Sequence, residues 1–344
     1  MAVTIKDVAR EARVSVASVS RALNGHSSMT ERTRGRILGV AERMRYVPHA
    51  GARSLIMRRT HTIGALLPDL HGEFFSELIR GIDLAARARG LHLLVSSSHG
   101  DVAEAAAALR ALQGRVDGLL VMWPHVDTSF LRDNLPETLP TVLMNTSVGK
   151  AAFSTLNLDN YGGALAMTRH LLGGGYRRIA MISGPEGNFD AGERLRGYRD
   201  ALARNHPRVE AQVVRGDFSE ESGYDAGKQL LASARRPQAV FAANDMMAVG
   251  CMYALIESGV RVPEDVALAG FDDIPISRYV NPPLTTVRVR IADLGRNALE
   301  RLALRLEHPD AEKTVAETLG CEIVVRASCG VPANIPPHHN KKTH

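Results

Sequence analysis

The sequence has few cysteines, few aromatic residues and no long hydrophobic run. Its 344 residues include three cysteines, Cys251, Cys321 and Cys329, and aromatic residues make up 5%. The cysteines lie far apart and match no metal-binding spacing, so they predict reduced structural thiols. No segment approaches the roughly 18 consecutive apolar residues of a membrane-spanning helix. The N-terminus also lacks an apolar secretory segment. These absences argue against a disulfide-rich secreted domain or a membrane protein, and they favour a cytoplasmic location.

Common catalytic motifs are absent as well. No G-x-G-x-x-G follows the first predicted strand, and neither a G-K-[ST] phosphate loop nor a G-x-S-x-G elbow occurs. Gly173-Gly-Gly175 follows a predicted helix and is interpreted as its C-cap. The tail, residues 331–344, contains three histidines without metal-ligand spacing and is expected to be disordered. The sequence therefore predicts no catalytic residues, no metal site, no cofactor and no enzymatic activity.

Positive charge is concentrated near the N-terminus. Residues 1–60 contain twelve Arg or Lys against four acidic residues, a balance of +8; the whole chain is +5, which leaves −3 for the remainder. A basic head on a near-neutral body is typical of a nucleic-acid-binding module attached to a second function. Phosphate contacts give affinity without sequence information, so specificity has to come from side chains that reach base edges.

Two short amphipathic helices are expected at the start of this basic head. Thr4 can cap the first, with Asp7 three residues later. Ser15 can cap the second, over 16–24, which places Val19 and Leu23 on its inner face. A helical hairpin capped by chance is the simpler alternative, but two helices joined by so short a turn fit a DNA major groove. The candidate DNA contacts are Thr4, Ser15, Val16, Ala17, Ser18, Ser20, Arg21 and Asn24.

A third helix and a linker follow. Thr30 is expected to cap a helix that runs to about Arg45 and packs back on the first two. Pro48 prevents its continuation, because proline lacks a backbone donor. Residues 49–59 are polar and basic except for Leu55-Ile56, and they predict a linker or a marginal helix.

Strand and helix patterns alternate from residue 60 onward. Strands are predicted at 62–67, 91–95, 118–122, 141–144, 178–182, 239–242 and 266–270. Helices are predicted at 74–89, 102–112, 161–172, 191–203, 220–232 and 245–258. This alternation predicts parallel, doubly wound α/β sheets covered on both faces. The units are too numerous for one sheet, and the Gly173–Gly175 break suggests a division into two lobes.

Polar residues follow several predicted strands, where parallel sheets bind ligands. Asn and Asp also favour helix N-caps, so each position taken alone has a simpler explanation. Their convergence at one edge, together with nearby aromatic residues, favours a cleft for a polyhydroxylated ligand. Carboxylates accept paired hydroxyls, and aromatic faces cover the C–H surface of a sugar. The polar residues are Asp69, Asn145, Asn188, Asp190, Asn244, Asp245, Asp272 and Asp273, and the aromatic ones are Phe74, Phe75, Trp123 and Phe271.

The sequence resembles the LacI/GalR (lactose/galactose-repressor) family of bacterial regulators over nearly its whole length. The resemblance is carried by Thr4-Ile-Lys-Asp-Val-Ala, by Val14 to Gly25, by Ala243-Asn-Asp-Met-Met-Ala248 and by Gly270-Phe-Asp-Asp273. It implies an all-α helix-turn-helix head (1–48), a hinge (49–59), a two-lobed body of periplasmic-binding-protein type (60–330) and a tail (331–344). The implied partners are a palindromic double-stranded DNA operator, a small effector between the lobes and a second copy in a homodimer.

The resemblance also implies roles for individual residues. Val16, Ala17 and Arg21 would read bases, and Leu55 would wedge into the central minor groove. Asp159 is a possible further contact at the cleft edge. Apart from the resemblance, the chemistry of a guanidinium and a carboxylate on different segments predicts that Arg194 and Asp272 hold opposite sides of one polyol, and an ion pair between the two that stabilises a lobe is the alternative. Asn145 stands where several relatives have an acidic residue. Val289 occupies a position at which the family often has a polar residue that contacts the effector. The effector contacts implied by the family and by the strand-end pattern are Asp69, Phe74, Phe75, Asn145, Asn188, Asp190, Arg194, Asn244 and Asp272.

We therefore expect a sequence-specific transcriptional regulator, a repressor of carbohydrate-utilisation genes controlled by a sugar-like effector. A purine or another small metabolite is the alternative effector. A stand-alone sugar-binding protein is disfavoured by the basic head and the missing export signal. An enzyme with a doubly wound fold is disfavoured by the missing motifs. The tail lacks leucine heptads, which favours a dimer over a tetramer.

Overall fold

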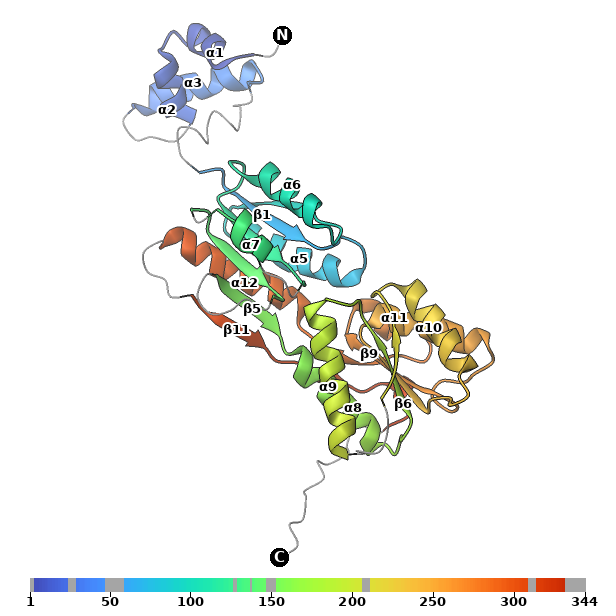
Figure 1. The fold of residues 1–344 in the computed structure, drawn as a ribbon. Coiled ribbons are helices and arrows are strands. Elements are labelled where there is room, and N and C mark those ends of the chain that lie inside the picture. Colours follow the sequence, from blue (N-terminus) through green and yellow to red (C-terminus); the bar gives the residue numbers. More distant parts are fainter. Residues whose placement is uncertain are drawn as a thin grey trace, which may run out of the picture. The chain divides into compact units, whose positions relative to one another are not determined.

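The structure is a computed structural model that describes residues 3–23, 29–46, 59–125, 129–136, 138–146, 153–205, 211–308 and 314–331. The chain divides into two compact units, Met1–Thr60 and His61–His344, whose elements are labelled in Figure 1. Asn24 and Leu55 lie outside the described residues, as do most of the predicted linker and nearly all of the predicted tail.

The first unit contains three helices, as predicted: α1 (Ile5–Glu11), α2 (Val16–Leu23) and α3 (Glu31–Arg43). Each helix contributes one completely buried side chain to a small core, namely Val8, Val19 and Ile37. Burial of these apolar side chains is what holds such short helices together, because isolated helices of this length are marginal in water.

The predicted helix caps are present. The backbone N–H and the hydroxyl of Thr4 both donate to the Asp7 carboxylate, at 3.0 and 2.6 Å. Ser15 Oγ accepts the Ser18 N–H at 3.1 Å, which starts α2. Between the two helices Arg13 adopts a left-handed φ of 52° and reverses the chain. Local chemistry thus fixes the short turn on which the relation of α1 to α2 depends.

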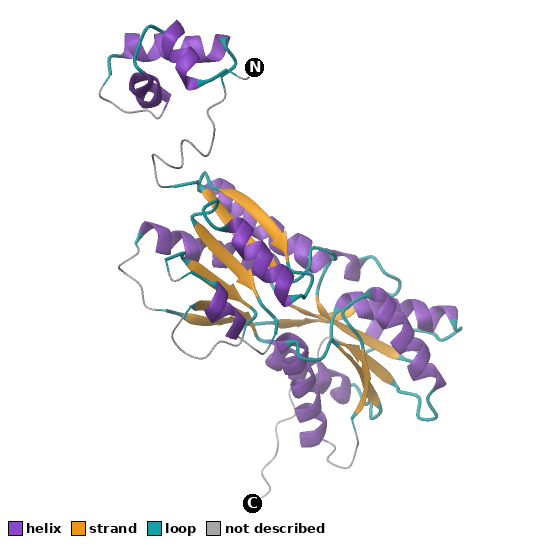
Figure 2. Cartoon of the chain, turned by 45° about the horizontal axis from the view of Figure 1, so that its top comes forward, coloured by secondary structure: helices purple, strands orange, loops and turns teal. Residues whose placement is uncertain are grey.

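The second unit contains two six-stranded sheets, one in each lobe (Figure 2). The N-lobe sheet has the order β11-β5-β4-β3-β1-β2 and is entirely parallel. The C-lobe sheet has the order β12-β10-β9-β8-β6-β7 and is parallel except for the antiparallel β10–β12 pair. The N-lobe strands are β1 (Thr62–Leu67), β2 (His92–Ser97), β3 (Gly118–Met122), β4 (Thr141–Met144), β5 (Ser154–Leu158) and β11 (Ala316–Leu319). The C-lobe strands are β6 (Ile179–Ser183), β7 (Gln212–Arg215), β8 (Ala239–Ala242), β9 (Ala267–Asp272), β10 (Thr285–Arg288) and β12 (Glu322–Val324).

Helices pack on both faces of each sheet, as the strand–helix alternation predicted. The N-lobe helices are α5 (Glu73–Ala88), α6 (Val102–Leu112), α7 (Ser129–Asn134) and α12 (Ile291–Glu307). The C-lobe helices are α8 (Asn160–Gly173), α9 (Phe189–Asn205), α10 (Glu220–Ala232) and α11 (Asp245–Glu257), with the short 3-10 helices η1 (Pro275–Arg278) and η2 (Ala327–Cys329). None of the helices in the described part of the chain combines the length and apolar character that a bilayer crossing requires.

The chain passes between the lobes three times: after β5, after β10 and after β11. The lobe boundary predicted at Gly173–Gly175 is therefore wrong. These glycines end α8 inside the C-lobe, where Gly174 is the C-cap, as the other interpretation of the motif held. The boundary was misplaced because α12 and β11 return to the N-lobe, so that neither lobe is a continuous segment.

The α10–α11 pair requires glycine at its contact. A Cβ on Gly250 would lie 1.9 Å from the Glu220 carbonyl oxygen, a backbone atom that cannot move by itself. We expect Gly250→Ala to destabilise the protein by about 1–3 kcal/mol, because the two helices must separate. Chemical denaturation measures this. The control is Gly192→Ala on α9, where nothing lies within 4 Å of the added atom. Equal denaturation midpoints for the two variants would refute the close-packing explanation.

Candidate functional site

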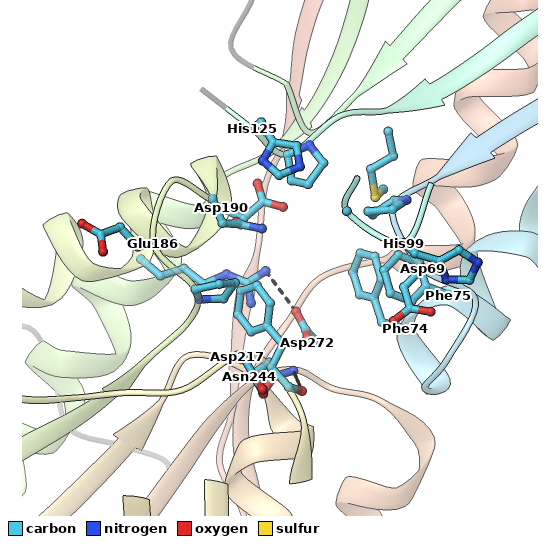
Figure 3. Close-up of a pocket in the computed structure, with 18 residues that line it drawn as sticks. Asp69, Phe74, Phe75, His99, His125, Glu186, Asp190, Asp217, Asn244 and Asp272 are labelled. Atoms are coloured by element: carbon cyan, nitrogen blue, oxygen red, sulfur yellow. Dashed lines mark hydrogen bonds and ion pairs between the residues drawn. The ribbon is translucent and has the colours of Figure 1, made fainter. Parts of the chain in front are cut away.

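A cavity of about 360 Å³ lies between the lobes, at the carboxyl ends of strands from both sheets (Figure 3). It is lined by eight of the nine residues predicted as effector contacts: Asp69, Phe74, Phe75, Asn188, Asp190, Arg194, Asn244 and Asp272. The ninth, Asn145, is completely buried and reaches the wall indirectly, because its Nδ2 donates to Asp190 at 3.1 Å. The strands of the two sheets thus bring side chains from distant parts of the sequence to one place.

Arg194 on α9 organises the C-lobe wall of the cavity. Its Nε donates to Asn160 Oδ1 at 2.8 Å, and its Nη1 donates to the Ala243 carbonyl at 2.5 Å. Its Nη2 lies 3.1 Å from Asp272 Oδ1, and the two side chains are only 3% and 5% exposed. The guanidinium covers the ring of Phe271, 3.9 Å from its centroid. A buried guanidinium is thereby neutralised and held in one orientation.

The expectation that Arg194 and Asp272 hold opposite sides of a ligand is wrong. Both belong to the C-lobe, and they form the ion pair that was the alternative expectation. The physical reason is that two opposite charges removed from water within one lobe stabilise each other at short range. The opposite side of the cavity is formed by the N-lobe, with the rings of Phe74 and Phe75 in edge-to-face contact, 5.4 Å between centroids.

Two buried carboxylates share this wall with one guanidinium. Asp190 accepts hydrogen bonds from Asn160 Nδ2 at 2.7 Å and from Asn145 Nδ2 at 3.1 Å. Burial raises the pKa of Asp190 to about 6 and the pKa of Asp272 to about 7, although the charge of Arg194 lowers both. The negative charge of Asp190 contributes to the raised pKa of Asp272. Near neutral pH, this pair of carboxyl groups therefore still binds a proton for part of the time.

This proton makes stability depend on pH. In the unfolded chain an aspartate releases its proton near pH 4, whereas Asp190 and Asp272 keep theirs to about pH 6 and 7 in the folded protein. The folded state therefore binds more protons across this interval, and stability falls as pH rises through it. We expect the melting temperature to drop between pH 5 and pH 8, and to drop less in Asp272→Asn. An identical slope in both proteins would contradict this account.

The backbone is strained where two of these side chains project. Asp272 has a φ of 115° and Asn145 a φ of 47°, values that residues other than glycine rarely adopt. Strain of this kind costs of order 1–3 kcal/mol and concentrates at ligand sites. Each residue stands at the carboxyl end of a strand, β9 or β4, so the strain is located at the cavity edge of the sheets.

Two cavity asparagines also cap helices. Asn244 Oδ1 accepts the Met247 N–H at 2.9 Å at the start of α11, and its Nδ2 donates to the Phe218 carbonyl at 2.9 Å. Asn188 Oδ1 accepts the Ala191 N–H at 3.0 Å. The simpler helix-cap explanation therefore holds for both residues and coexists with their position in the cavity wall.

Three other strand-end residues have internal partners and do not line the cavity. Asp245 accepts hydrogen bonds from the Thr286 hydroxyl and the Ile274 N–H, at 2.6 and 3.0 Å. Asp273 is bound by Arg326 and by Arg288. Asp159 caps α8 by accepting the Gly162 N–H at 2.8 Å. The expected ligand role of these three residues is replaced by a structural one.

Two of the predicted aromatic residues and Val289 are core residues. Trp123 is 2% exposed and stacks on Phe130, with ring centroids 4.5 Å apart. Phe271 is completely buried beneath Arg194. Val289 is 3% exposed and lines a different, smaller hollow beside η1. The cavity therefore owes its aromatic surface to Phe74, Phe75 and a residue that the sequence did not reveal.

That residue is Phe218, one of several lining residues that sequence reasoning missed. Phe218 and Asp217 follow β7, a short, half-exposed strand that gave no apolar signal. His99 lies just beyond β2, so the strand-end rule could have found it. His125 follows β3, where a backbone bridge to Asn188 joins the two lobes. A second contact between the lobes is formed by η1 and α5, where the Ile276 N–H donates to Glu73 Oε2 at 2.7 Å.

In the head, α2 presents the expected base-reading side chains. Val16 is 41% exposed, and Ala17 and Arg21 are exposed as well. Val19 and Ala22 face the core, whereas Leu23 is only partly buried at its edge. Arg21 Nε donates to the Ala17 carbonyl at 3.3 Å, a contact that the side chain can exchange for a base edge.

The other predicted DNA contacts in the described part of the head have local hydrogen-bond partners. Ser15 and Ser18 bond each other at 2.9 Å, and Thr4 bonds Asp7. Ser20 is half-buried. The described residues contain no group of three or more His, Cys, Asp or Glu side chains placed to hold a metal ion.

Comparison with known proteins gives matches to both parts of the chain. A family model described as bacterial regulatory proteins, lacI family, matches residues 4–49, and one described as a periplasmic binding protein-like domain matches residues 168–329. The ribose operon repressor of Escherichia coli (strain K12) is 38% identical over 316 residues, 90% of this chain and 95% of that protein. The HTH-type transcriptional repressor PurR of Klebsiella pneumoniae (strain 342) is 36% identical and covers 91% of this chain and 93% of its own length.

Solved structures show the same likeness. The lac repressor dimer bound to operator and the anti-inducer ONPF is 29% identical, with a TM-score of 0.85, and the match covers 96% of this chain and 99% of that chain. A LacI family transcriptional regulator from Enterococcus faecium with bound ribose is 28% identical, with a TM-score of 0.71, over 78% of this chain and 98% of that chain.

Proposed function

We propose a sugar-controlled, dimeric mode of action for this chain, which belongs to the lacI family of bacterial regulatory proteins. As a member of that family it is a DNA-binding transcriptional regulator with an effector-binding body. Our proposal adds that two copies bind an inverted repeat, that they repress carbohydrate-utilisation genes in the cytoplasm, and that a small sugar between the lobes changes their affinity for DNA.

The interlobe cavity is the observation that carries this proposal. Its volume of about 360 Å³ is at the small end for ligand sites and suits a single small molecule. Arg194 and Asp272 offer charged hydrogen-bonding groups, which bind hydroxyls more strongly than neutral groups do. The Phe74 and Phe75 rings on the other lobe suit the C–H surface of a sugar ring. The ribose named for two relatives supports a monosaccharide.

Fluorescence anisotropy on the DNA that flanks the protein's own gene tests the proposal, with monosaccharides and purines added in turn. We expect a monosaccharide to change the dissociation constant for that DNA and to leave random DNA unaffected. A response to purines alone would replace the sugar with the purine effector. Sugar binding without any DNA binding would identify a stand-alone binding protein.

The base-reading role of α2 gives a separate prediction. Arg21 can make paired hydrogen bonds to a guanine edge, so Arg21→Ala should cost about 1–3 kcal/mol on the specific site and much less on random DNA. Arg21→Lys keeps the charge but loses the paired donors, and we expect it to resemble Arg21→Ala on the specific site. Equal losses on both DNAs would make Arg21 a phosphate contact.

A further inference from the structure

We infer that the interlobe cavity excludes anionic ligands, so that its effector is a hydrogen-bond donor without phosphate or carboxylate groups. The inference rests on the proposed function, because it narrows the chemical class of the effector bound at that site. The shape of the cavity alone does not decide between a neutral sugar and its phosphate ester, because the sugar ring of either can lie against Phe74 and Phe75.

The charges that line the cavity are predominantly negative. Among the residues that the structure describes, Arg194 is the one lysine or arginine in the lining, and its charge is already opposed by Asp272 at 3.1 Å. Arg215 reaches Glu186 at 2.7 Å, but both side chains are more than half exposed, so water and salt weaken that pair. Two histidines, His99 and His125, also belong to the described lining. The five acidic lining residues are Asp69, Glu186, Asp190, Asp217 and Asp272.

A negative surplus inside a cavity acts more strongly than the same surplus on an open surface. Asp190 and Asp272 are buried, so protein of low dielectric screens their charges less than water does. Asp69, Glu186 and Asp217 are exposed and act more weakly, although a concave site concentrates the field. A phosphate dianion entering between these carboxylates would meet repulsion from both lobes, because Asp69 belongs to the N-lobe and the other four acids to the C-lobe. An uncharged hydroxyl meets no such repulsion.

The hydrogen bonds of the wall lead independently to the same class of ligand. Among the described residues, Asn145 Oδ1 and Asp272 Oδ1 are the buried side-chain polar atoms with unused acceptor capacity. Asp272 Oδ1 faces Arg194 Nη2 at 3.1 Å in an ion pair, and a carboxylate oxygen can accept a second hydrogen bond beside that contact. Both atoms are acceptors. Asp272 lines the cavity, so a ligand that satisfies it has to bring an O–H or N–H group.

The donors of the wall, by contrast, are largely engaged within the protein. Arg194 gives its Nε to Asn160 and its Nη1 to Ala243. The amide groups of Asn145 and Asn160 donate to Asp190, and the Asn244 amide donates to the Phe218 carbonyl. A phosphate dianion or a carboxylate offers only acceptors, so it would leave the Asp272 oxygen unsatisfied and displace existing bonds. Charge and hydrogen-bond inventory therefore point to one ligand class.

Isothermal titration of the full chain at pH 8 tests this inference with matched ligand pairs: D-ribose and D-ribose 5-phosphate, D-glucose and D-glucose 6-phosphate, adenosine and adenosine 5′-monophosphate. For each pair in which at least one compound binds, we expect the uncharged compound to bind at least 100-fold more tightly than its phosphate ester. A phosphate ester that binds as tightly as its parent would overturn the inference and leave a sugar-controlled regulator intact. Binding of adenosine but of neither sugar, with its 5′-monophosphate excluded, would sustain the inference and remove the proposed sugar effector.

Charge variants separate electrostatic exclusion from a lack of space. Two lining acids that do not contact Arg194 can be neutralised together with Glu186→Gln and Asp217→Asn. Because both side chains are exposed, we expect this change to reduce only severalfold the ratio of the affinity for the uncharged compound to the affinity for its phosphate ester. The matched control is Asp265→Asn, which makes the same kind of charge change near the other end of β9, where Asp265 pairs with exposed Arg261. An unchanged ratio in the double variant, with its unliganded melting temperature retained, would mean that phosphates are excluded by size and would overturn the charge argument. If the double variant does not fold, Asp217→Asn alone decides in the same way.

Discussion

Replacement of Arg194 by alanine is expected to destabilise the protein by about 3–5 kcal/mol at pH 8, because it leaves buried carboxylates without their counter-charge. Asp190 and Asp272 would lose the one cation of the described part of their wall, and the Ala243 carbonyl would lose a donor. The carboxylates can avoid ionisation by taking up protons, so the loss should be smaller at pH 5 than at pH 8. Chemical denaturation of the full chain at the two pH values measures both effects.

Arg196 supplies a matched control on the same helix. It pairs with Glu193 at 2.5 Å, but its side chain is 54% exposed, and ion pairs in solvent contribute little. We therefore expect Arg196→Ala to denature close to the wild type, with no added dependence on pH. A similar loss of stability in both variants would mean that burial does not increase the contribution of the Arg194 ion pair to folding.

The strands whose bounds could be predicted from the sequence are buried runs of apolar residues. β1, β3, β4 and β8 have the predicted bounds, since each is an apolar run with nearly every residue buried. The edge strands β7, β11 and β12 were missed because their side chains are partly exposed and show no apolar run. β5 and β10 were missed for a different reason: each begins with two buried hydroxyl residues, Ser154 and Thr155 in β5 and Thr285 and Thr286 in β10, so neither shows an apolar run.

The division into lobes could not be read from the sequence. The return of β11 to pair with β5, more than 150 residues earlier in the chain, is a long-range pairing that no local pattern encodes. The glycine run at 173–175 gave a strong local signal instead, and that signal proved to belong to a helix end. Local chemistry thus located the elements, whereas their partners depend on contacts between distant segments.

The strand-end rule placed residues at the cavity but could not resolve neighbours. Asp272 lines the cavity, while the adjacent Asp273 turns into the C-lobe and binds Arg326 and Arg288. Asn244 and Asp245 differ in the same way. The outcome at each pair depends on backbone angles, such as the φ of 115° at Asp272 and of 56° at Asp273, which composition does not reveal.

Asp272→Asn is expected to leave the chain folded and bound to its DNA while weakening the neutral effector at least 100-fold, about 2.7 kcal/mol. Asparagine keeps the shape of the side chain and removes a carboxylate whose pKa burial has raised to about 7, so no folding free energy need be lost. Arg194 keeps its bonds to Asn160 and Ala243. The ligand, however, loses a charged acceptor for its hydroxyl groups. Calorimetry with the effector, together with DNA binding in its presence and absence, measures the loss.

Asp273→Asn is the matched control. Asp272 and Asp273 are adjacent in sequence, but we expect the first to affect effector binding and the second to affect stability. Asp273 is buried among Arg326, Arg288 and Arg278, with the Ser277 hydroxyl donating to it at 3.1 Å. Losing its charge should therefore lower the melting temperature and leave effector affinity close to the wild type. A normal effector response in Asp272→Asn would remove Asp272 from the site, and loss of folding would reduce it to a structural residue. If both variants instead lose effector binding in proportion to their stability, the wall acts as one structural unit, and specificity has to lie in the N-lobe side of the cavity.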